Sequence, residues 1–118
     1  TDVTSAQFIK YMANCFFATK VSFMNEMKQA ADKLGIKWDD VMHGFISDGR
    51  IGNSHLDVPG HDGSLGFGGK CFPKDLNAFI GLFEELGVEP KVMRAAWQKN
   101  LEVRNNHDWR EIEGAVSK

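Results

Sequence analysis

Residues 4–35 read TSAQFIKYMANCFFATKVSFMNEMKQAADKLG, and neither proline nor glycine interrupts the run before Gly35. Apolar side chains recur in it at spacings of three and four, the period of an amphipathic helix. They are Phe8, Met12, Cys15, Phe16, Phe23, Met27, Ala30, Ala31 and Leu34. Thr4 or Ser5 is a suitable N-cap, and Gly35 suits a left-handed C-cap. The pattern predicts a helix over about residues 4–34.

The predicted helix is long for the chain that contains it. About 31 residues at 1.5 Å each give roughly 46 Å. The whole chain has 118 residues, which is the usual size of one domain. Because a domain of this size cannot cover so long a helix, we expect the helix to pack against a partner chain or to join two domains.

The remaining regular elements are also expected to be helical. Asp39 is a plausible N-cap for a short second helix, and Pro73 and Pro90 favour the first turns of the next two. No segment shows the period-two alternation of a strand. The predicted fold class is therefore all-α, with a long N-terminal helix and a compact helical cluster. The expected further helices cover about residues 39–47, 73–87, 90–103 and 109–113.

A long glycine-rich loop separates the second and third predicted helices. Residues 48–72 contain seven glycines, and structureless loops of this length are usually functional or disordered. Arg50 near its start either clamps a phosphate or hydroxyl group or is simply solvated. The loop's histidines and aspartates match no zinc-ligand spacing, so no metal site is expected. These residues are His55, Asp57, His61 and Asp62.

Composition excludes several classes of protein. Fourteen basic and sixteen acidic residues give a net charge of −2, which argues against a nucleic-acid partner or a membrane surface. No apolar run approaches the roughly 18 residues that span a bilayer. Two cysteines make no disulfide framework, so a reducing, cytoplasmic location is the simpler expectation.

The strongest chemical signal is Cys71, within GFGGKCFPKD at residues 66–75. It stands just before Pro73 and so near a helix N-terminus, where unpaired amides and the helix dipole favour a thiolate. Lys70 and Lys74 add positive charge. The loop's glycines let the backbone approach a ligand, and their N–H groups can hold an anion. This setting suits a nucleophile, although a buried structural cysteine remains an alternative.

Three more residues are candidates for the same chemistry. Asp75 lies four residues beyond Cys71, where a carboxylate either orients water or stabilises the helix through its dipole. Lys10 and Asn14 share one face of the first predicted helix, as oxyanion donors or as a solvated surface pair. No GxGxxG dinucleotide fingerprint follows a strand, so the chain is not expected to hold NAD by itself.

Three motifs together resemble the UDP-glucose/GDP-mannose dehydrogenase family, and most closely its members that act on UDP-glucose. GFGGKCFPKD at 66–75 resembles the family's catalytic-cysteine motif. FIKYMAN at 8–14, continuing to SFMNE at 22–26, resembles the start of its central helix, and RIG at 50–52 resembles its substrate-loop entry. The motifs stand in the family's order and cover about residues 4–104.

The resemblance implies a reaction and residues that carry it. The family oxidises the C6 alcohol of a sugar nucleotide to a carboxylate, with two hydride transfers to two NAD. Cys71 matches the cysteine that forms the thiohemiacetal and thioester. Lys10 and Asn14 match the pair that stabilises the oxyanion and positions water, and Asp75 matches the acid that assists them.

The resemblance also implies substrate contacts. Phe67 and Gly68 match the loop that lies against the sugar. Arg50 matches an arginine that reaches the substrate of the adjacent subunit. The expected partners are therefore a UDP-sugar and a second copy of the chain.

The implied architecture resembles the C-terminal domain of 6-phosphogluconate dehydrogenase, with the long helix at the core of a homodimer. Residues 1–118 would be the central dimerisation and catalytic-cysteine domain, without the NAD-binding Rossmann domain and the C-terminal UDP-binding domain. The isolated chain is expected to lack dehydrogenase activity. Two other functions stay open, a non-catalytic helical dimerisation module and a cysteine hydrolase. The hydrolase requires a histidine beside Cys71.

Overall fold

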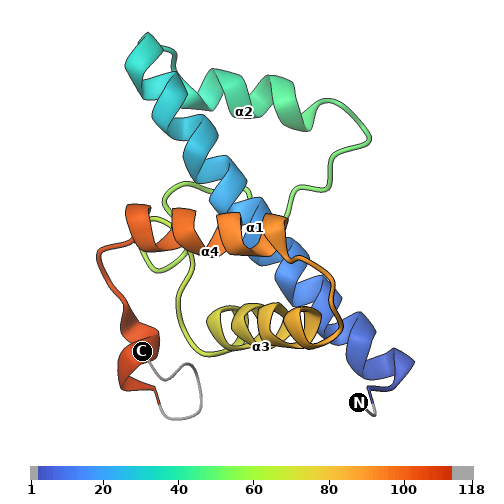
Figure 1. Ribbon diagram of the computed structural model, residues 1–118. Helices are drawn as coiled ribbons and strands as arrows, with labels where there is room; N and C mark the ends of the chain where they lie inside the picture. The colour runs from blue at the N-terminus through green and yellow to red at the C-terminus, as the bar shows by residue number, and fades with distance from the viewer. Residues whose placement is uncertain (1–2, 113–118) are drawn as a thin grey trace.

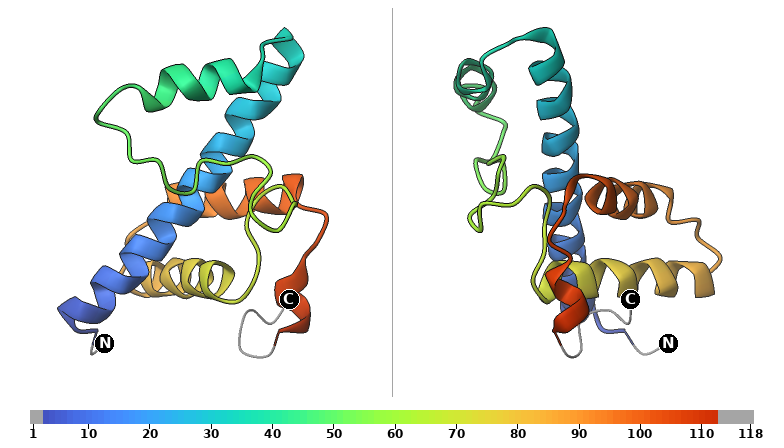
Figure 2. Two further views of the ribbon diagram at one scale, coloured as in Figure 1. Left: turned by 180° about the vertical axis from the view of Figure 1, so that it is seen from behind. Right: turned by 90° about the vertical axis from the view of Figure 1, so that its left-hand side faces the viewer.

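The computed structural model describes residues 3–112, and every regular element in that range is a helix. The all-α fold class is thereby confirmed. α3 and α4 lie side by side on one side of α1, and α2 with the loop after it lies on the other side (Figures 1 and 2). None of these helices is long and apolar enough to cross a membrane. The elements are α1 (Ser5–Leu34), α2 (Trp38–Ile46), α3 (Cys71–Glu85), α4 (Lys91–Val103) and a 3-10 helix, η1 (Asp108–Glu111).

The predicted long helix is confirmed at both ends. Thr4 is its N-cap and forms a capping box: its hydroxyl accepts from the Gln7 N–H at 3.2 Å, and the Gln7 side chain accepts from the Thr4 N–H at 3.0 Å. Gly35 ends the helix with a φ of 70°, a left-handed conformation that glycine adopts without strain. About 45 Å of helix therefore runs along the molecule, whose longest dimension is 47 Å (Figure 1).

Other helix boundaries differ from the prediction by one or two residues. Lys37 is the N-cap of α2, and Asp39 lies in the first turn instead. α3 begins at Cys71, before Pro73, so the thiol belongs to the first turn. Proline is tolerated there because N–H groups of a first turn have no partner within the helix. The predicted tail helix is η1, and Glu113 lies outside the described residues.

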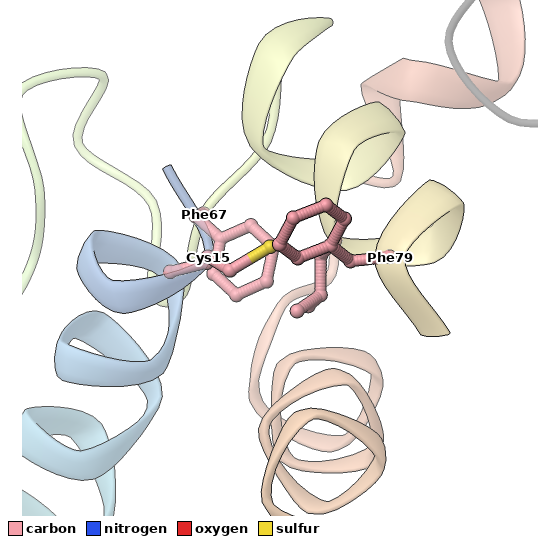
Figure 3. Close-up of a cluster of buried hydrophobic side chains, with 5 residues drawn as sticks. Cys15, Phe67 and Phe79 are labelled. Carbon is pink, nitrogen blue, oxygen red and sulfur yellow. The ribbon is translucent and has the colours of Figure 1, made fainter. Parts of the chain in front are cut away.

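The core lies where the glycine loop meets α1 and α3. Figure 3 shows Cys15 of α1, Phe67 of the loop and Phe79 of α3 pointing toward one another. Ala18 and Leu76 complete the buried cluster. The loop is therefore anchored in the core through Phe67, directly before the segment that carries Cys71.

Most of the large apolar side chains in the predicted stripe of α1 do not pack inside this domain. Its large members Phe8, Met12, Phe16, Phe23, Met27 and Leu34 are between 37% and 73% exposed. The buried face carries small and polar residues such as Ala18, Ser22 and Asn25. The Ser22 hydroxyl donates to the Ala96 carbonyl at 2.7 Å, which ties α4 closely to α1. As its length predicts, α1 offers more apolar surface than this chain covers.

Candidate active site

Two hydrogen bonds join α1 to Asp75 of α3 at the predicted site. The Asn14 side-chain amide donates to Oδ2 of Asp75 at 2.7 Å. Asp75 is fully buried in the second turn of α3, because the helix begins at Cys71, before Pro73. At the same junction, the Cys15 thiol donates to the Asp75 backbone carbonyl at 3.6 Å. The fold thus brings together two of the residues that the sequence singled out, although 61 positions separate them.

The second carboxylate oxygen of Asp75 is less well satisfied. Lys74 Nζ lies 3.3 Å from Oδ1 and forms an ion pair with it. Within the described structure, this ion pair does not have the geometry of a hydrogen bond, and no other group donates a hydrogen bond to Oδ1. Buried carboxylate oxygens normally accept hydrogen bonds, so this oxygen has unused acceptor capacity.

Cys71 and Lys10 each lie one helical turn from this hydrogen bond. Cys71 is an exposed free thiol at the start of α3, four residues before Asp75. Lys10 is exposed on α1, four residues before Asn14. Residues four apart share a helix face. The candidate site therefore consists of Lys10 and Asn14 on α1 and of Cys71 and Asp75 on α3. The Asn14–Asp75 hydrogen bond links the two pairs.

The glycine loop differs from the prediction that its amides hold a ligand anion. Between Gly66 and Gly69, three N–H groups already donate to side chains from other parts of this chain. Because Asp108 is one of the acceptors, the anion held by the loop is the protein's own carboxylate. The pairs are Gly66 with Asn25 Oδ1 at 3.2 Å, Phe67 with Asn100 Oδ1 at 2.7 Å, and Gly69 with both Asp108 oxygens at 3.0 Å.

The predicted substrate residues Phe67 and Gly68 lie on the wall of a pocket of about 320 Å³. The Phe67 side chain is buried and packs edge-on against Phe72, with ring centroids 6.3 Å apart. His55 forms another part of the wall and stacks on Phe17 at 4.3 Å. Partial burial, with the charges of Lys20 and His61, lowers the pKa of His55, so its imidazole is neutral at pH 7.

Arg50 is not brought to this group. It follows α2, whereas α2 and α3 lie toward opposite ends of α1 (Figure 1). Its guanidinium makes two hydrogen bonds to Asp48, at 3.0 and 2.8 Å. This pairing lowers the pKa of Asp48 and raises that of Arg50. Within this chain Arg50 is an exposed, internally paired cation.

A histidine base for a cysteine hydrolase is missing from the described residues. No hydrogen bond joins Cys71 to any histidine between residues 3 and 112. His55 stacks on Phe17, and His107 stacks on Trp109 at 4.7 Å. The geometry that would support the hydrolase interpretation is therefore not present there.

Four polar residues that hold the loop were missed from the sequence. Asn25, Asn100, Arg104 and Asp108 all bind backbone groups between Leu65 and Gly69. Only Asn100 carried a usable signal, because it lies three residues after Trp97 on the apolar face of α4. A polar residue at such a position is usually buried for a specific partner.

Comparison with known proteins shows the family to which the chain belongs. Residues 4–102 match the central domain of the UDP-glucose/GDP-mannose dehydrogenase family. The chain belongs to this family, as its central domain.

Its relatives are named UDP-glucose 6-dehydrogenase. That of Pseudomonas aeruginosa is 44% identical over 95 residues, which are 80% of this chain and 20% of the relative. The Rickettsia felis protein is 37% identical over 106 residues, covering 90% and 22%. One from Bacillus subtilis is 33% identical over 118 residues, covering 100% and 25%. The chain thus spans a quarter or less of the length of these relatives.

The two cysteines are expected to differ sharply in reactivity. Burial and then the charge of Asp75 raise the pKa of Cys15 to about 12, so roughly one molecule in ten thousand carries the Cys15 thiolate at pH 8. Cys71 is exposed at a helix N-terminus. Iodoacetamide should alkylate Cys71 first by a wide margin at neutral pH, as peptide mass mapping would detect. Equal alkylation rates for the two cysteines would contradict the argument that the N-terminus of α3 favours a reactive thiol.

Proposed function

We propose that this chain is the catalytic-cysteine unit of an NAD-dependent enzyme that oxidises UDP-glucose to UDP-glucuronate. The observation that carries the proposal is the Asn14–Asp75 hydrogen bond. Cys71 on α3 and Lys10 on α1 each lie one helical turn from this hydrogen bond. The names of the relatives support UDP-glucose as the substrate.

Cys71 is the nucleophile in this proposal. Two NAD molecules, bound in turn by another domain of the complete enzyme, would supply the oxidant by taking one hydride each from C6 of the sugar. After the first hydride has left, the Cys71 thiolate adds to the aldehyde carbon and gives a thiohemiacetal. Loss of the second hydride leaves a thioester. Water then attacks its carbonyl, which releases the carboxylate and restores the thiol.

The neighbouring side chains stabilise charge and hold water. Lys10 and Asn14 donate to the oxygen on which negative charge develops. Asp75 accepts from the hydrolytic water through Oδ1, which is ion-paired with Lys74 but makes no hydrogen bond within the described structure. Its buried position and the Asn14 bond keep that oxygen oriented. Phe67 and Gly68 line a pocket that also contains Phe72, the residue after Cys71, and this pocket binds the sugar in the proposal. Arg50 serves the site of an adjacent subunit.

The described residues do not fit NAD by themselves. A dinucleotide site is built from a strand, a glycine turn and a helix, and residues 3–112 contain no strand. Because these relatives are about four times as long as this chain, we propose that an NAD-binding domain and a UDP-binding domain belong to the complete enzyme.

An assay of the complete enzyme tests the proposed function. It should form two NADH for each UDP-glucuronate, and prefer UDP-glucose to GDP-mannose and UDP-N-acetyl sugars. The isolated 118-residue chain should form no NADH. NADH formation by the isolated chain would contradict the proposal that NAD is bound by another domain. Failure of the complete enzyme to oxidise any of these sugars would favour a non-catalytic dimerisation module.

We also propose that a second copy of the chain packs against the exposed face of α1. A groove of about 540 Å³ runs between α1, α3 and the segment before α4. Its walls are mainly apolar and include Phe8, Met12, Phe16, Phe83 and Val92. Exposed apolar area of this extent usually marks an interface, and a homodimer would bury it.

A charged substitution tests this interface. Phe16, 62% exposed, contributes little to the fold of one chain, so Phe16→Asp should leave helicity intact and turn the dimer into a monomer. Lys33→Glu, exposed near the end of α1, is the control and should stay dimeric. Sedimentation equilibrium measures both. A Phe16→Asp protein that is still dimeric would place the interface elsewhere.

A further inference from the structure

We infer that Arg104 and Asp108 are positioning residues, which fix the glycine loop so that Cys71 meets the aldehyde before it escapes. The inference rests on the proposed function for the aldehyde, and on geometry for the clamp. We call the two residues and their contacts the loop clamp. It lies on the segment after α4, beyond the residues that match the family's central domain.

Arg104 forms the first half of the clamp. It is 1% exposed, and its guanidinium donates to three separate acceptors. A buried guanidinium with this many partners has one orientation available, because each donor it loses would be left unsatisfied. Two of the acceptors belong to the loop. The acceptors are Asp62 Oδ2 at 2.7 Å, the Leu65 carbonyl at 3.3 Å and the Asn106 carbonyl at 2.5 Å.

Asp108 forms the second half. Both of its carboxylate oxygens accept from the Gly69 N–H at 3.0 Å. Arg104 Nη2 lies 3.5 Å from Asp108 Oδ1 and balances its charge. Gly69 stands directly before Lys70, the N-cap of α3, and two residues before Cys71. The clamp therefore holds the backbone at the point from which the thiol is presented.

Gly68 allows the clamp to close. A Cβ atom at residue 68 would lie 2.3 Å from both Arg104 Nη2 and Asp108 Oδ1, far inside van der Waals contact. The absence of a side chain at this position is thus required by the clamp itself. Behind it, the buried Trp109 packs on Trp97 with ring centroids 5.0 Å apart, which fixes η1 against α4.

The clamp is separate from the apolar core. The core cluster holds Phe67, whereas every clamp contact to the loop is polar and ends on Asp62, Leu65 or Gly69. Loss of the clamp should therefore loosen residues 68–71 while the helices stay packed. This separation makes a positioning role distinguishable from a contribution to overall stability.

The first experiment uses the chain itself and needs no dehydrogenase activity. Asp108→Ala should raise amide hydrogen exchange at Gly69 by at least about tenfold, and slow Cys71 alkylation about threefold as the first turn of α3 frays. Asp108→Asn retains an acceptor and should restore most of both. Glu111→Ala, exposed on the same 3-10 helix, is the matched control and should change neither.

The second experiment counts products in the complete enzyme. If Cys71 is misplaced, aldehyde escapes after one hydride transfer, so Asp108→Ala should form more than two NADH per UDP-glucuronate. Asp108→Asn should lie nearer to two. Arg104→Gln should behave like Asp108→Ala, with the exposed Arg110→Gln as its control. A merely less stable enzyme would turn over more slowly and keep the ratio at two.

The outcomes separate the two proposals. Unchanged Gly69 exchange or unchanged Cys71 alkylation in Asp108→Ala would overturn the clamp, whatever the enzyme does. If Asp108→Ala shows faster amide exchange at Gly69 but still forms two NADH per UDP-glucuronate, the clamp contributes to stability alone and the positioning role is overturned. If the wild-type enzyme forms no NADH, the proposed function fails, and the exchange and alkylation results still decide whether the clamp sets Cys71.

Discussion

Cys71→Ser in the complete enzyme is expected to lower UDP-glucuronate formation by roughly a thousandfold or more, as removal of a covalent nucleophile does elsewhere. A serine hydroxyl is not ionised near neutral pH, and no histidine in residues 3–112 hydrogen-bonds at this position to activate it. The fold should be unaffected because the side chain is exposed. Chromatographic measurement of UDP-glucuronate, with circular dichroism for folding, checks both parts.

Ala78→Ser serves as the control for this substitution. Ala78 is exposed on the same helix, so it acquires the same hydroxyl group away from the proposed chemistry and should keep full activity. A Cys71→Ser enzyme that still formed UDP-glucuronate at a tenth of the normal rate would show that the thiol is not the nucleophile. Lys10 and Asp75 would then need other roles.

Gly66→Ala is expected to destabilise the chain by about 3 kcal/mol or more, from backbone strain and overpacking together. Gly66 has a φ of 71°, and a Cβ there would lie 2.2 Å from Asn100 Oδ1. Asn100 cannot move aside without cost, since it also donates to the Phe67 carbonyl at 2.9 Å. Urea unfolding followed by circular dichroism measures the free energy of unfolding.

Gly63→Ala isolates the strain from the clash. Gly63 has a φ of 79°, but open space surrounds the position of its Cβ, so the substitution should cost only about 1 kcal/mol. Comparable losses in the two variants would mean that Asn100 moves freely, and that the loop is not held at Phe67. A Gly66→Ala, Asn100→Ala double variant should relieve the clash but not restore the lost hydrogen bonds.

The fold class and the bounds of α1 could be predicted because their causes are local. Helical periodicity, the Thr4 capping box and the left-handed Gly35 all act within a few residues. The N-terminus of α3 was harder, since Pro73 is compatible with any first-turn position. The direction in which the α1 stripe points could not be predicted, because an apolar face packs equally well inside its own domain or against another chain.

The candidate site depended on contacts that spacing does not encode. Cys71 stood out from its local chemistry, but the Asn14–Asp75 bond joins residues on different helices. The glycine loop was expected to hold a ligand anion, and nothing local indicated that its Gly69 amide instead binds the carboxylate of Asp108, 39 residues further on. Such long-range polar pairs follow from topology, which the sequence pattern does not specify.

The position of the loop clamp also determines which truncations of this domain keep the candidate site, and when that site can form during synthesis. A truncation at residue 102, where the family match ends, would keep nearly all of α4 and discard Arg104 and Asp108. Such a fragment would be helical and would keep the contacts of Phe67 with the core and with Asn100, but it would lose the hydrogen bonds that hold Gly69, two residues before Cys71. During synthesis on the ribosome, the segment that carries the clamp is added after the loop. Cys71 is synthesised before Asp108, so the Gly69 contact that is proposed to position the thiol can form only after residue 108 has been added.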